Sequence, residues 1–159
     1  MSLTNPIALA AALCMLAGCA TTPGGGSARS AAALSAVITP YDAIQRAAAA
    51  APDGIEGVFE MRVLATGRKN GSGFLNSETD YRDQRNLTIA IEPGALARLE
   101  ADAGASGIDT FKGRTIRVTG SARRTRIALV ASGRVTDKYY YQTHVRVSDP
   151  AQIDIVAGG

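Results

Sequence analysis

The chain has 159 residues, of which 46% are hydrophobic and 19% charged, and its formal net charge is +3. This length suits one domain with a single core and leaves no room for a second. The sequence contains no GxSxG, HExxH, P-loop or CxxC motif, so it lacks common signatures of hydrolases, zinc proteases, nucleotide-binding loops and thiol redox sites.

The N-terminal segment is apolar from Ile7 onward and ends in Leu16-Ala17-Gly18-Cys19, which resembles a bacterial lipobox. About 11 apolar residues fit the hydrophobic region of a signal peptide and are too few to span a bilayer as a helix. The resemblance implies that residues 1–18 are a lipoprotein signal peptide and that Cys19 is lipidated. No Lys or Arg precedes the apolar run, and an uncleaved hydrophobic tail is the alternative.

A lipid on Cys19 implies an exported protein that is held on a membrane at its N-terminus. Ala20 stands where an aspartate would follow the cysteine, and by resemblance to Gram-negative lipoproteins this implies the outer membrane, with the protein facing the periplasm. Cys14 would be removed with the signal peptide. No disulfide or metal-thiolate site is therefore expected.

Residues 19–38 are predicted to be a flexible tether, because they are rich in Ala, Gly, Ser and Thr and include Gly24-Gly25-Gly26. Residues 39–159 are predicted to form the single domain, which opens with a helix over residues 40–51. Thr39 suits the N-cap and Pro40 the first helical position. Tyr41, Ile44 and Ala48 share one face of this helix.

Strand-like alternation follows the helix. Phe59, Met61, Val63 and Ala65 alternate with polar or smaller residues in a first strand, Asn70-Gly71-Ser72-Gly73 supplies a turn, and residues 74–76 and 87–91 form the next two strands. A second helix is predicted over residues 93–103. A long fourth strand runs over residues 115–130 with a bend or bulge at Gly120, a loop runs from Ser132 to Lys138, a fifth strand covers residues 139–147, and a short strand covers residues 153–156.

This order predicts a mainly β fold, a small five-stranded OB-like barrel with one helix between strands 3 and 4 and a short helix in front. The segments Phe74-Leu75-Asn76-Ser77-Glu78-Thr79-Asp80-Tyr81-Arg82, Leu87-Thr88-Ile89, Phe111-Lys112-Gly113-Arg114-Thr115-Ile116-Arg117-Val118-Thr119-Gly120 and Asp149-Pro150-Ala151-Gln152-Ile153 resemble uncharacterised bacterial OB-fold domains. Those domains are distantly similar to OB modules of the tRNA-anticodon-binding type. OB barrels bind many kinds of ligand, so the resemblance implies the fold and leaves the function open.

Charge is unevenly distributed along the domain. Residues 53–110 hold ten acids and six bases, a balance of −4, whereas residues 111–147 hold nine bases and one acid, a balance of +8. The basic part predicts a surface for an anionic partner. The residues expected to bind are Arg114, Arg117, Arg123, Arg124, Arg126, Tyr140 and Arg146. Because alternate strand residues point to opposite faces, either Tyr139 with Tyr141 or Tyr140 alone lines one surface, and the first two are candidates for the core.

Three functions are compatible with these features. The first is a lipid-anchored, non-catalytic envelope module or scaffold that presents a basic surface to a protein or an anionic polymer. The second is single-stranded nucleic-acid binding, since basic and aromatic side chains serve that purpose, although free nucleic acid is scarce in the periplasm. The third is a metal-dependent phosphodiesterase that uses the acids Glu78, Asp80 and Asp83.

Support for catalysis is thin. The interleaved Arg82 and Arg85 favour mutual ion pairs over a cation at the acidic cluster. His144, the single histidine, has no neighbouring cysteine or carboxylate in the sequence and is expected to be an exposed or hydrogen-bonded strand residue. No cofactor is expected.

Overall fold

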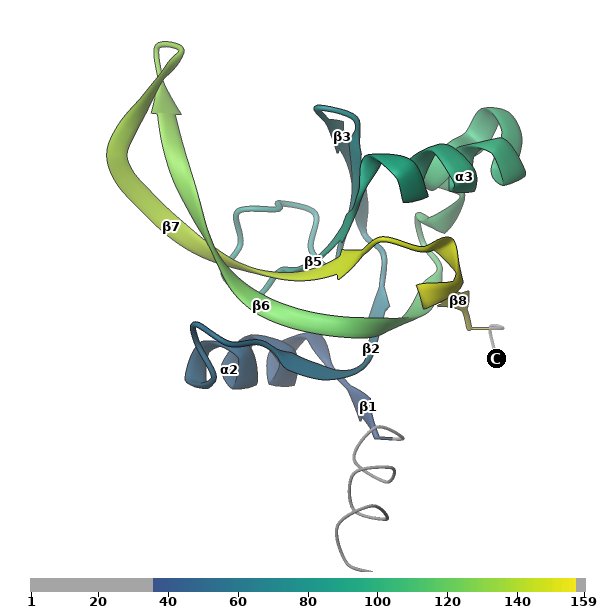
Figure 1. Ribbon diagram of the computed structural model, residues 1–159, viewed down its shortest axis with the longest axis horizontal. Coiled ribbons are helices and arrows are strands. Elements are labelled where there is room, and N and C mark those ends of the chain that lie inside the picture. Colours follow the sequence, from purple (N-terminus) through teal and green to yellow (C-terminus); the bar gives the residue numbers. More distant parts are fainter. Residues whose placement is uncertain (1–35, 157–159) are drawn as a thin grey trace, which may run out of the picture.

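The computed structural model describes residues 36–156 (Figure 1). The predicted signal peptide, Cys19 and most of the tether lie outside the described residues. In chain order the elements are β1 (Val37–Ile38), α2 (Pro40–Ala49), β2 (Ile55–Arg62), β3 (Ala65–Lys69), β4 (Ser72–Asn76), β5 (Leu87–Ile91), α3 (Pro93–Ala103), η1 (Gly104–Phe111), β6 (Thr115–Ala131), β7 (Arg134–Val147), η2 (Pro150–Gln152) and β8 (Ile153–Ile155).

The strands form one mixed sheet in the order β1-β2-β6-β7-β5-β4-β3, with β8 paired to β6. The β1–β2 and β5–β7 pairs are parallel and the others are antiparallel. This mainly β architecture is consistent with an OB-like domain. The expectation of a closed five-stranded barrel was wrong, because the described part of the chain has eight strands in an open sheet.

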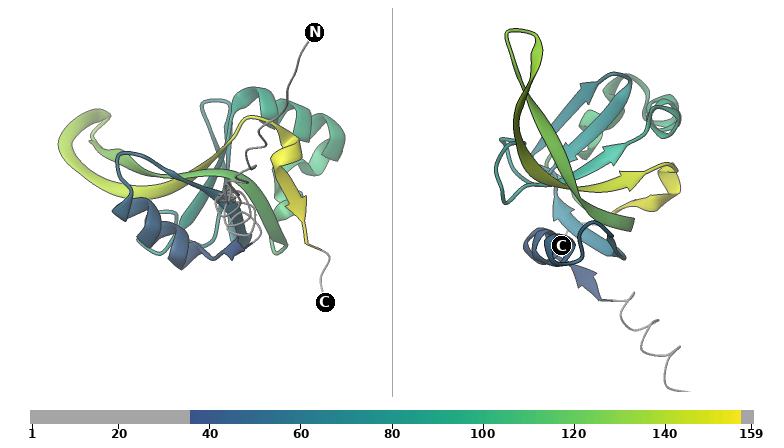
Figure 2. Two further views of the ribbon diagram at one scale, coloured as in Figure 1. Left: turned by 60° about the horizontal axis from the view of Figure 1, so that its bottom comes forward. Right: turned by 60° about the vertical axis from the view of Figure 1, so that its left-hand side comes forward.

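The predicted first strand is divided into β2 and β3 because the chain changes partners between them. Val63 N–H donates to the carbonyl of Arg114, which precedes β6, at 2.8 Å. Leu64 N–H donates to the carbonyl of Asn76, at the end of β4, at 2.9 Å. Two consecutive residues thus bond to neighbours on opposite sides of the chain. The sheet as a whole is strongly twisted (Figure 2).

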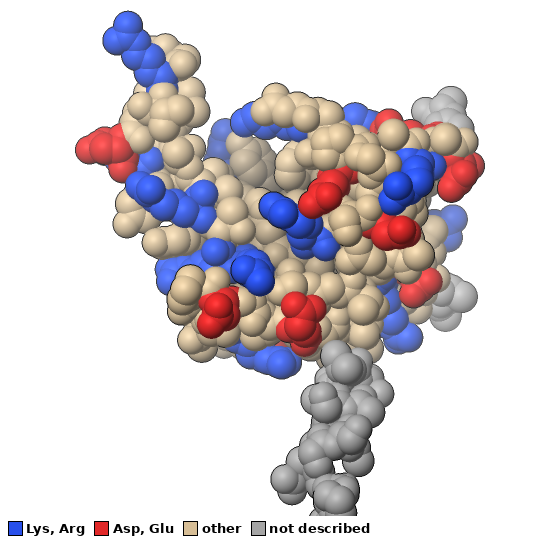
Figure 3. Space-filling model, viewed as in Figure 1, with Lys and Arg blue, Asp and Glu red and all other residues tan. Residues whose placement is uncertain are grey.

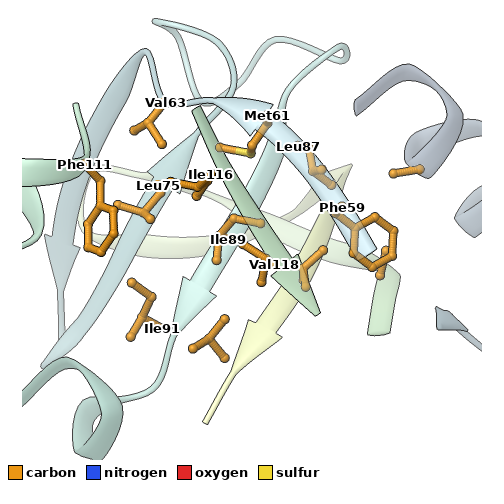
Figure 4. Close-up of a cluster of buried hydrophobic side chains, with 14 of the residues drawn as sticks. Phe59, Met61, Val63, Leu75, Leu87, Ile89, Ile91, Phe111, Ile116 and Val118 are labelled. Atoms are coloured by element: carbon orange, nitrogen blue, oxygen red, sulfur yellow. The ribbon is translucent and has the colours of Figure 1, made fainter. Parts of the chain in front are cut away.

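The predicted alternation is confirmed in the core for Phe59, Met61 and Val63 (Figure 4). Ala65, expected on the same buried face, lies beyond the change of partners and is only partly buried. Phe59 and Val63 from the first predicted strand are fully buried, as are Leu87, Ile89 and Ile91 of β5. Residues on β6 and β7, among them Ile116, Val118, Val145 and Val147, complete the same cluster. Because these side chains come from strands far apart in the sequence, the core joins both ends of the domain.

The first helix begins as predicted and ends at Ala49, two residues early. Thr39 caps it, since its Oγ1 accepts a hydrogen bond from Asp42 N–H at 3.2 Å. The helix buries Ala43 and Ala47 against the sheet. The face with Tyr41, Ile44 and Ala48 points elsewhere, and the Tyr41 side chain is 69% exposed. Small side chains let α2 approach β2 and β6 closely, whereas a tyrosine would hold the helix away.

The second helix, α3, has the predicted bounds, and 3₁₀ turns continue it to Phe111. None of the helices in residues 36–156 is both long enough and apolar enough to cross a membrane.

The hairpin of β6 and β7 corrects two expectations. Its loop is the two-residue turn Ser132-Gly133, with φ of 50° and 75°, so β7 begins at Arg134 and not after Lys138. Such left-handed pairs match the twist of the flanking strands. No bulge occurs at Gly120, since the pairing of β6 with β2 continues unbroken past it, and the irregular register lies between Ala128 and Val130. The hairpin projects from the rest of the domain (Figures 1 and 2).

Candidate binding site

One row of aligned residues crosses five strands on the face of the sheet that points away from the core. Ala65 of β3 pairs with Asn76, Asn76 with Thr88, Thr88 with His144, and His144 with Arg123. Because paired residues point to the same side of a sheet, these five side chains lie on one surface. We call this surface the outer face.

A pocket of about 450 Å³ opens on the outer face. It is lined by residues of β3, β4 and β5, of the β6–β7 hairpin and of the loop after β4. These residues are Ala65, Thr66, Gly67, Arg68, Lys69, Phe74, Asn76, Thr79, Tyr81, Thr88, Ile127, Tyr140, Gln142 and His144. The lining combines aromatic rings with neutral polar groups and two bases. Such a mixture can hold a ligand by its apolar surface and orient it by a few hydrogen bonds.

Gln142 organises the polar part of this pocket. Its Nε2 donates to the Tyr81 carbonyl at 2.7 Å and to the Tyr140 hydroxyl at 3.2 Å, which directs Oε1 toward His144. His144 Nε2 lies 2.8 Å from that oxygen, and since an amide oxygen only accepts, Nε2 carries the proton. The lone pair of His144 therefore resides on Nδ1, and the Tyr140 hydroxyl keeps its own proton for another acceptor.

Burial lowers the pKa of His144 to about 4, so the imidazole is neutral at physiological pH. The expectation of a hydrogen-bonded strand histidine is confirmed, with Gln142 as its partner. In the neutral state His144 offers one acceptor rather than a positive charge. It does not add to the basic character of the outer face.

The loop between β4 and β5, residues 77–86, is fixed by a buried amide. Asn86 Nδ2 donates to Asn76 Oδ1 at 3.1 Å and to Thr88 Oγ1 at 2.9 Å, and its Oδ1 accepts from Glu78 N–H at 3.1 Å. This side chain also donates to the Tyr81 carbonyl at 3.3 Å. Asn86 thus holds the loop, with its tyrosine, against one side of the pocket.

The rim of the pocket at β3 carries two bases of different character. Arg68 forms ion pairs with Glu100 at 2.8 Å and with Asp109 at 3.3 Å. Hydrogen bonds from Thr66 and from Arg68 keep the pKa of Asp109 below its usual value. The charge of Arg68 is therefore compensated, whereas Lys69 forms no ion pair with any residue that the structure describes.

On the opposite side of the hairpin, two arginines stack on two tyrosines. The guanidinium of Arg124 lies 3.8 Å from the ring centre of Tyr141, and that of Arg126 lies 4.1 Å from the ring centre of Tyr139. The two rings meet edge to face with centres 5.5 Å apart. Tyr139 and Tyr141 are 47% and 41% exposed, so the interpretation of these tyrosines as core residues was wrong. The core ends at Thr143, before the hairpin leaves the domain.

The structure does not bring the seven predicted binding residues onto one surface. Arg123, Tyr140 and Arg146 belong to the outer face, whereas Arg124 and Arg126 lie on the opposite side of the hairpin, because their positions alternate with Arg123 along β6. The other two, Arg114 and Arg117, lie near the far end of β6 and are exposed.

Two of the predicted arginines are paired with acids. Arg117 contacts Glu60 at 2.7 Å, and Arg146 contacts Glu92 at 3.4 Å. The remaining arginines of β6 form no ion pair within residues 36–156. Three neighbouring arginines of the projecting hairpin, Arg123, Arg124 and Arg126, are therefore open to a partner, and basic side chains outnumber the acidic one in this hairpin (Figure 3).

The acidic cluster after β4 forms local ion pairs and turns. Asp83 contacts Arg85 at 2.7 Å, and this hydrogen-bonded pair lowers the pKa of Asp83 to about 2. Asp80 accepts from the backbone N–H of Arg82 at 2.9 Å. Within residues 36–156, no three His, Cys, Asp or Glu side chains are grouped so that they could hold a metal ion. The geometry thus gives the phosphodiesterase alternative no metal site in this region.

Sequence reasoning missed the pocket, although part of its signal was present. Alternation places Thr88 opposite to the buried Leu87 and Ile89, and the same alternation places Asn76 and Phe74 opposite to Leu75. The sequence does not show the register that aligns β4 and β5 with β7. The Gln142 bridge to the Tyr81 carbonyl spans 61 positions and depends on that register.

No protein-family model and no curated protein matches this sequence. Among solved structures, the chain is similar to a chain described as an aspartyl-tRNA synthetase from Leishmania major Friedlin, with a TM-score of 0.39 and 12% identity over 78% of this chain and 21% of that chain. An aspartyl-tRNA synthetase from Entamoeba histolytica gives a TM-score of 0.36 and 11% identity over 65% of this chain and 18% of that chain. This chain therefore spans about a fifth of the length of those structures. Similarity at this level does not indicate what this chain binds.

Proposed function

We propose that this protein is a non-catalytic, lipid-anchored binding module of the bacterial cell envelope, which holds an anionic partner at the base of its β6–β7 hairpin. The lipobox-like Leu16-Ala17-Gly18-Cys19 supports the anchor, and Ala20 supports the outer membrane as its location. The partner is a protein with an acidic surface or an anionic envelope polymer. The hairpin base is defined as residues 123–126 together with residues 139–142 of β7.

The observation that carries this proposal is the uncompensated charge of Arg123, Arg124 and Arg126. All three side chains are exposed, and none forms an ion pair within residues 36–156, unlike Arg117 and Arg146 on the same two strands. Like charges held close together on one rigid hairpin create a positive potential that attracts anions. A carboxylate or phosphate would restore the missing partners through bidentate hydrogen bonds to a guanidinium.

The tyrosines favour this use of the arginines. Stacking of Arg124 on Tyr141 and of Arg126 on Tyr139 holds each guanidinium plane in place before a partner arrives. A long side chain that is already oriented loses less conformational entropy on binding. The Arg–Tyr pairs thus increase affinity for a partner that needs two fixed positive groups.

Single-stranded nucleic acid is a second candidate partner. The aromatic rings of Phe74, Tyr81 and Tyr140 all line the pocket on the outer face, and Arg123 lies on the same face. Aromatic rings next to a basic side chain can stack bases and follow a phosphodiester. The number of phosphates contacted would then appear in the salt dependence of binding.

Salt titrations of binding test the proposal. The whole protein, solubilised from membranes, would be titrated with polyglutamate and with a single-stranded oligonucleotide, while crosslinking in intact envelopes captures the native partner. The R123S/R124S/R126S variant should lose most binding and most of the salt dependence. The R46S/R62S/K112S variant removes three exposed charges elsewhere that also form no ion pair within residues 36–156, and it should bind like the native protein.

The two variants separate the outcomes. Equal binding by both would overturn the hairpin base as the site, and a log-log salt slope of about 0.7 per phosphate with the oligonucleotide alone would favour the second candidate. The anchor has its own test, mass spectrometry of the mature N-terminus. An intact residue 1 with unmodified Cys19 would overturn the anchor without affecting the binding result.

A further inference from the structure

The tip of the β6–β7 hairpin exposes apolar side chains to solvent. Leu129, Val130 and Val135 are 41%, 60% and 72% exposed, and they surround the turn Ser132-Gly133. The ribbon views place this tip away from the rest of the domain (Figures 1 and 2). Large aliphatic side chains gathered on a projecting tip indicate an interaction surface, because nothing in their own domain covers them.

The strand pairing places two of these side chains side by side. Val130 and Val135 are directly paired across the two strands, so they point to the same side of the hairpin. Leu129 lies at the irregularity of the hairpin, where this one residue of β6 is opposite residues 136–138 of β7. The two-residue turn, made of left-handed residues, keeps the strands paired up to the end of the hairpin, so this group lies close to that end.

Two basic side chains of β7 flank the apolar group along the hairpin. Arg134 pairs with Ala131 next to the turn, nearer to the end of the hairpin than Val130 and Val135, and Lys138 follows Val135 on the other side of the group. Asp137 is the single acid among residues 123–141. The space-filling view shows the bases at the turn and along the hairpin (Figure 3).

We propose that this tip docks on a bilayer that contains anionic lipid. Leu129, Val130 and Val135 enter the boundary between headgroups and acyl chains, while Arg134 and Lys138 contact the headgroup phosphates. An apolar group flanked by bases is complementary to a lipid surface, which is apolar inside and anionic outside. The side-chain stems of Arg134 and Lys138 can extend toward the headgroups while the aliphatic side chains lie deeper.

Charge argues against a second copy of this chain as the occupant. Two identical tips would bring their Arg134 and Lys138 residues together, and like charges facing each other are unfavourable. An anionic lipid surface instead complements them. The inference uses the tip, and neither the anionic partner at the hairpin base nor the lipid on Cys19 is needed for it. Docking would fix the orientation of the outer face relative to the membrane.

A position-specific fluorescent label tests this inference. The full chain with C14S/C19S would carry one environment-sensitive dye, either at the tip through V135C or on exposed α3 through A97C. Each protein would be mixed with vesicles of phosphatidylcholine alone or of phosphatidylcholine with phosphatidylglycerol. The tip label should shift to shorter wavelength with the anionic vesicles, whereas the label on α3 should not change, even where the N-terminal segment binds vesicles.

Variants at the tip make the test decisive. Adding R134S/K138S to the tip-labelled protein should weaken the response to anionic vesicles by about tenfold or more, since each base near such a surface contributes on the order of fivefold. Adding L129S/V130S should remove the shift. The inference is overturned if both labels shift equally, or if the shift of the tip label survives in the L129S/V130S variant. It is also overturned if the tip label shifts with protein concentration in the absence of vesicles, since that would indicate pairing between copies.

Discussion

His144 donates its Nε2 proton to Gln142 Oε1 at 2.8 Å, and the same glutamine is held by the Tyr81 carbonyl on its other side. This chain of two hydrogen bonds connects β7 to the loop after β4 across the pocket. Burial favours the neutral imidazole and brings the pKa of His144 down to about 4. Protonation of His144 would place an unpaired positive charge on the side of the pocket that is lined by neutral groups.

Acid should therefore destabilise the protein through His144. The pKa falls from 6.5 in the unfolded chain to about 4 in the folded one, so the unfolded state binds the proton first as the pH falls. Stability is lost between these two values, by on the order of 3 kcal/mol at its limit. Urea unfolding of the native protein and of H144Q at about pH 7 and about pH 4 would measure this difference. Carboxylates titrate in both proteins, and an equal loss in both would contradict the prediction.

Asn86 offers a second test, because its buried amide makes hydrogen bonds with several partners. The N86A variant would leave the Glu78 N–H without this partner, whereas Asn76 Oδ1 keeps the hydrogen bond from Thr88 Oγ1 at 3.0 Å, and Asn86 is only 2% exposed. We expect a loss of about 2–4 kcal/mol in the free energy of unfolding, since each lost hydrogen bond costs about 0.5–1.5 kcal/mol and a polar group left unpaired about 1–3 kcal/mol. Exposed Gln84 in the same loop is the matched control. Its replacement by Ala should change stability by less than about 0.5 kcal/mol.

Local sequence patterns predicted much of this fold because they depend on local physics. The alternation of Leu87, Ile89 and Ile91 needs only a sheet with one buried face, and Pro93 sets the start of α3 by its fixed φ. The turn at Ser132-Gly133 was harder to predict. Its residues adopt left-handed φ that serine seldom takes, so the sequence favoured a longer loop.

The candidate site was less predictable because it depends on register between distant strands. Alternation shows that Arg123 and Arg124 point to opposite sides, yet it does not show that Glu60 meets Arg117 or that Glu92 meets Arg146. Those ion pairs decide which positive charges stay open to a partner. Ionic contacts of this kind follow from tertiary structure alone, and composition can predict only that the region is basic.

The start of the domain provides the last prediction. The predicted tether includes Val37 and Ile38, whereas the structure pairs both with β2, opposite Val58 and Phe59. Ile38 is 3% exposed and fills the space above Gly57, where an added Cβ would lie 2.4 Å from Ile38 Cδ1. The tether is therefore shorter than predicted, because a large aliphatic residue at its end completes the core.

Replacement of Ile38 by Ala should lower the free energy of unfolding by about 2–4 kcal/mol, as for other buried large-to-small changes. Val37 is the control on the same strand, since its side chain is 39% exposed and V37A should cost less than about 1 kcal/mol. Denaturant unfolding of both variants gives the comparison. Equally small losses would mean that β1 adds nothing to the core and that the domain begins at the Thr39 cap.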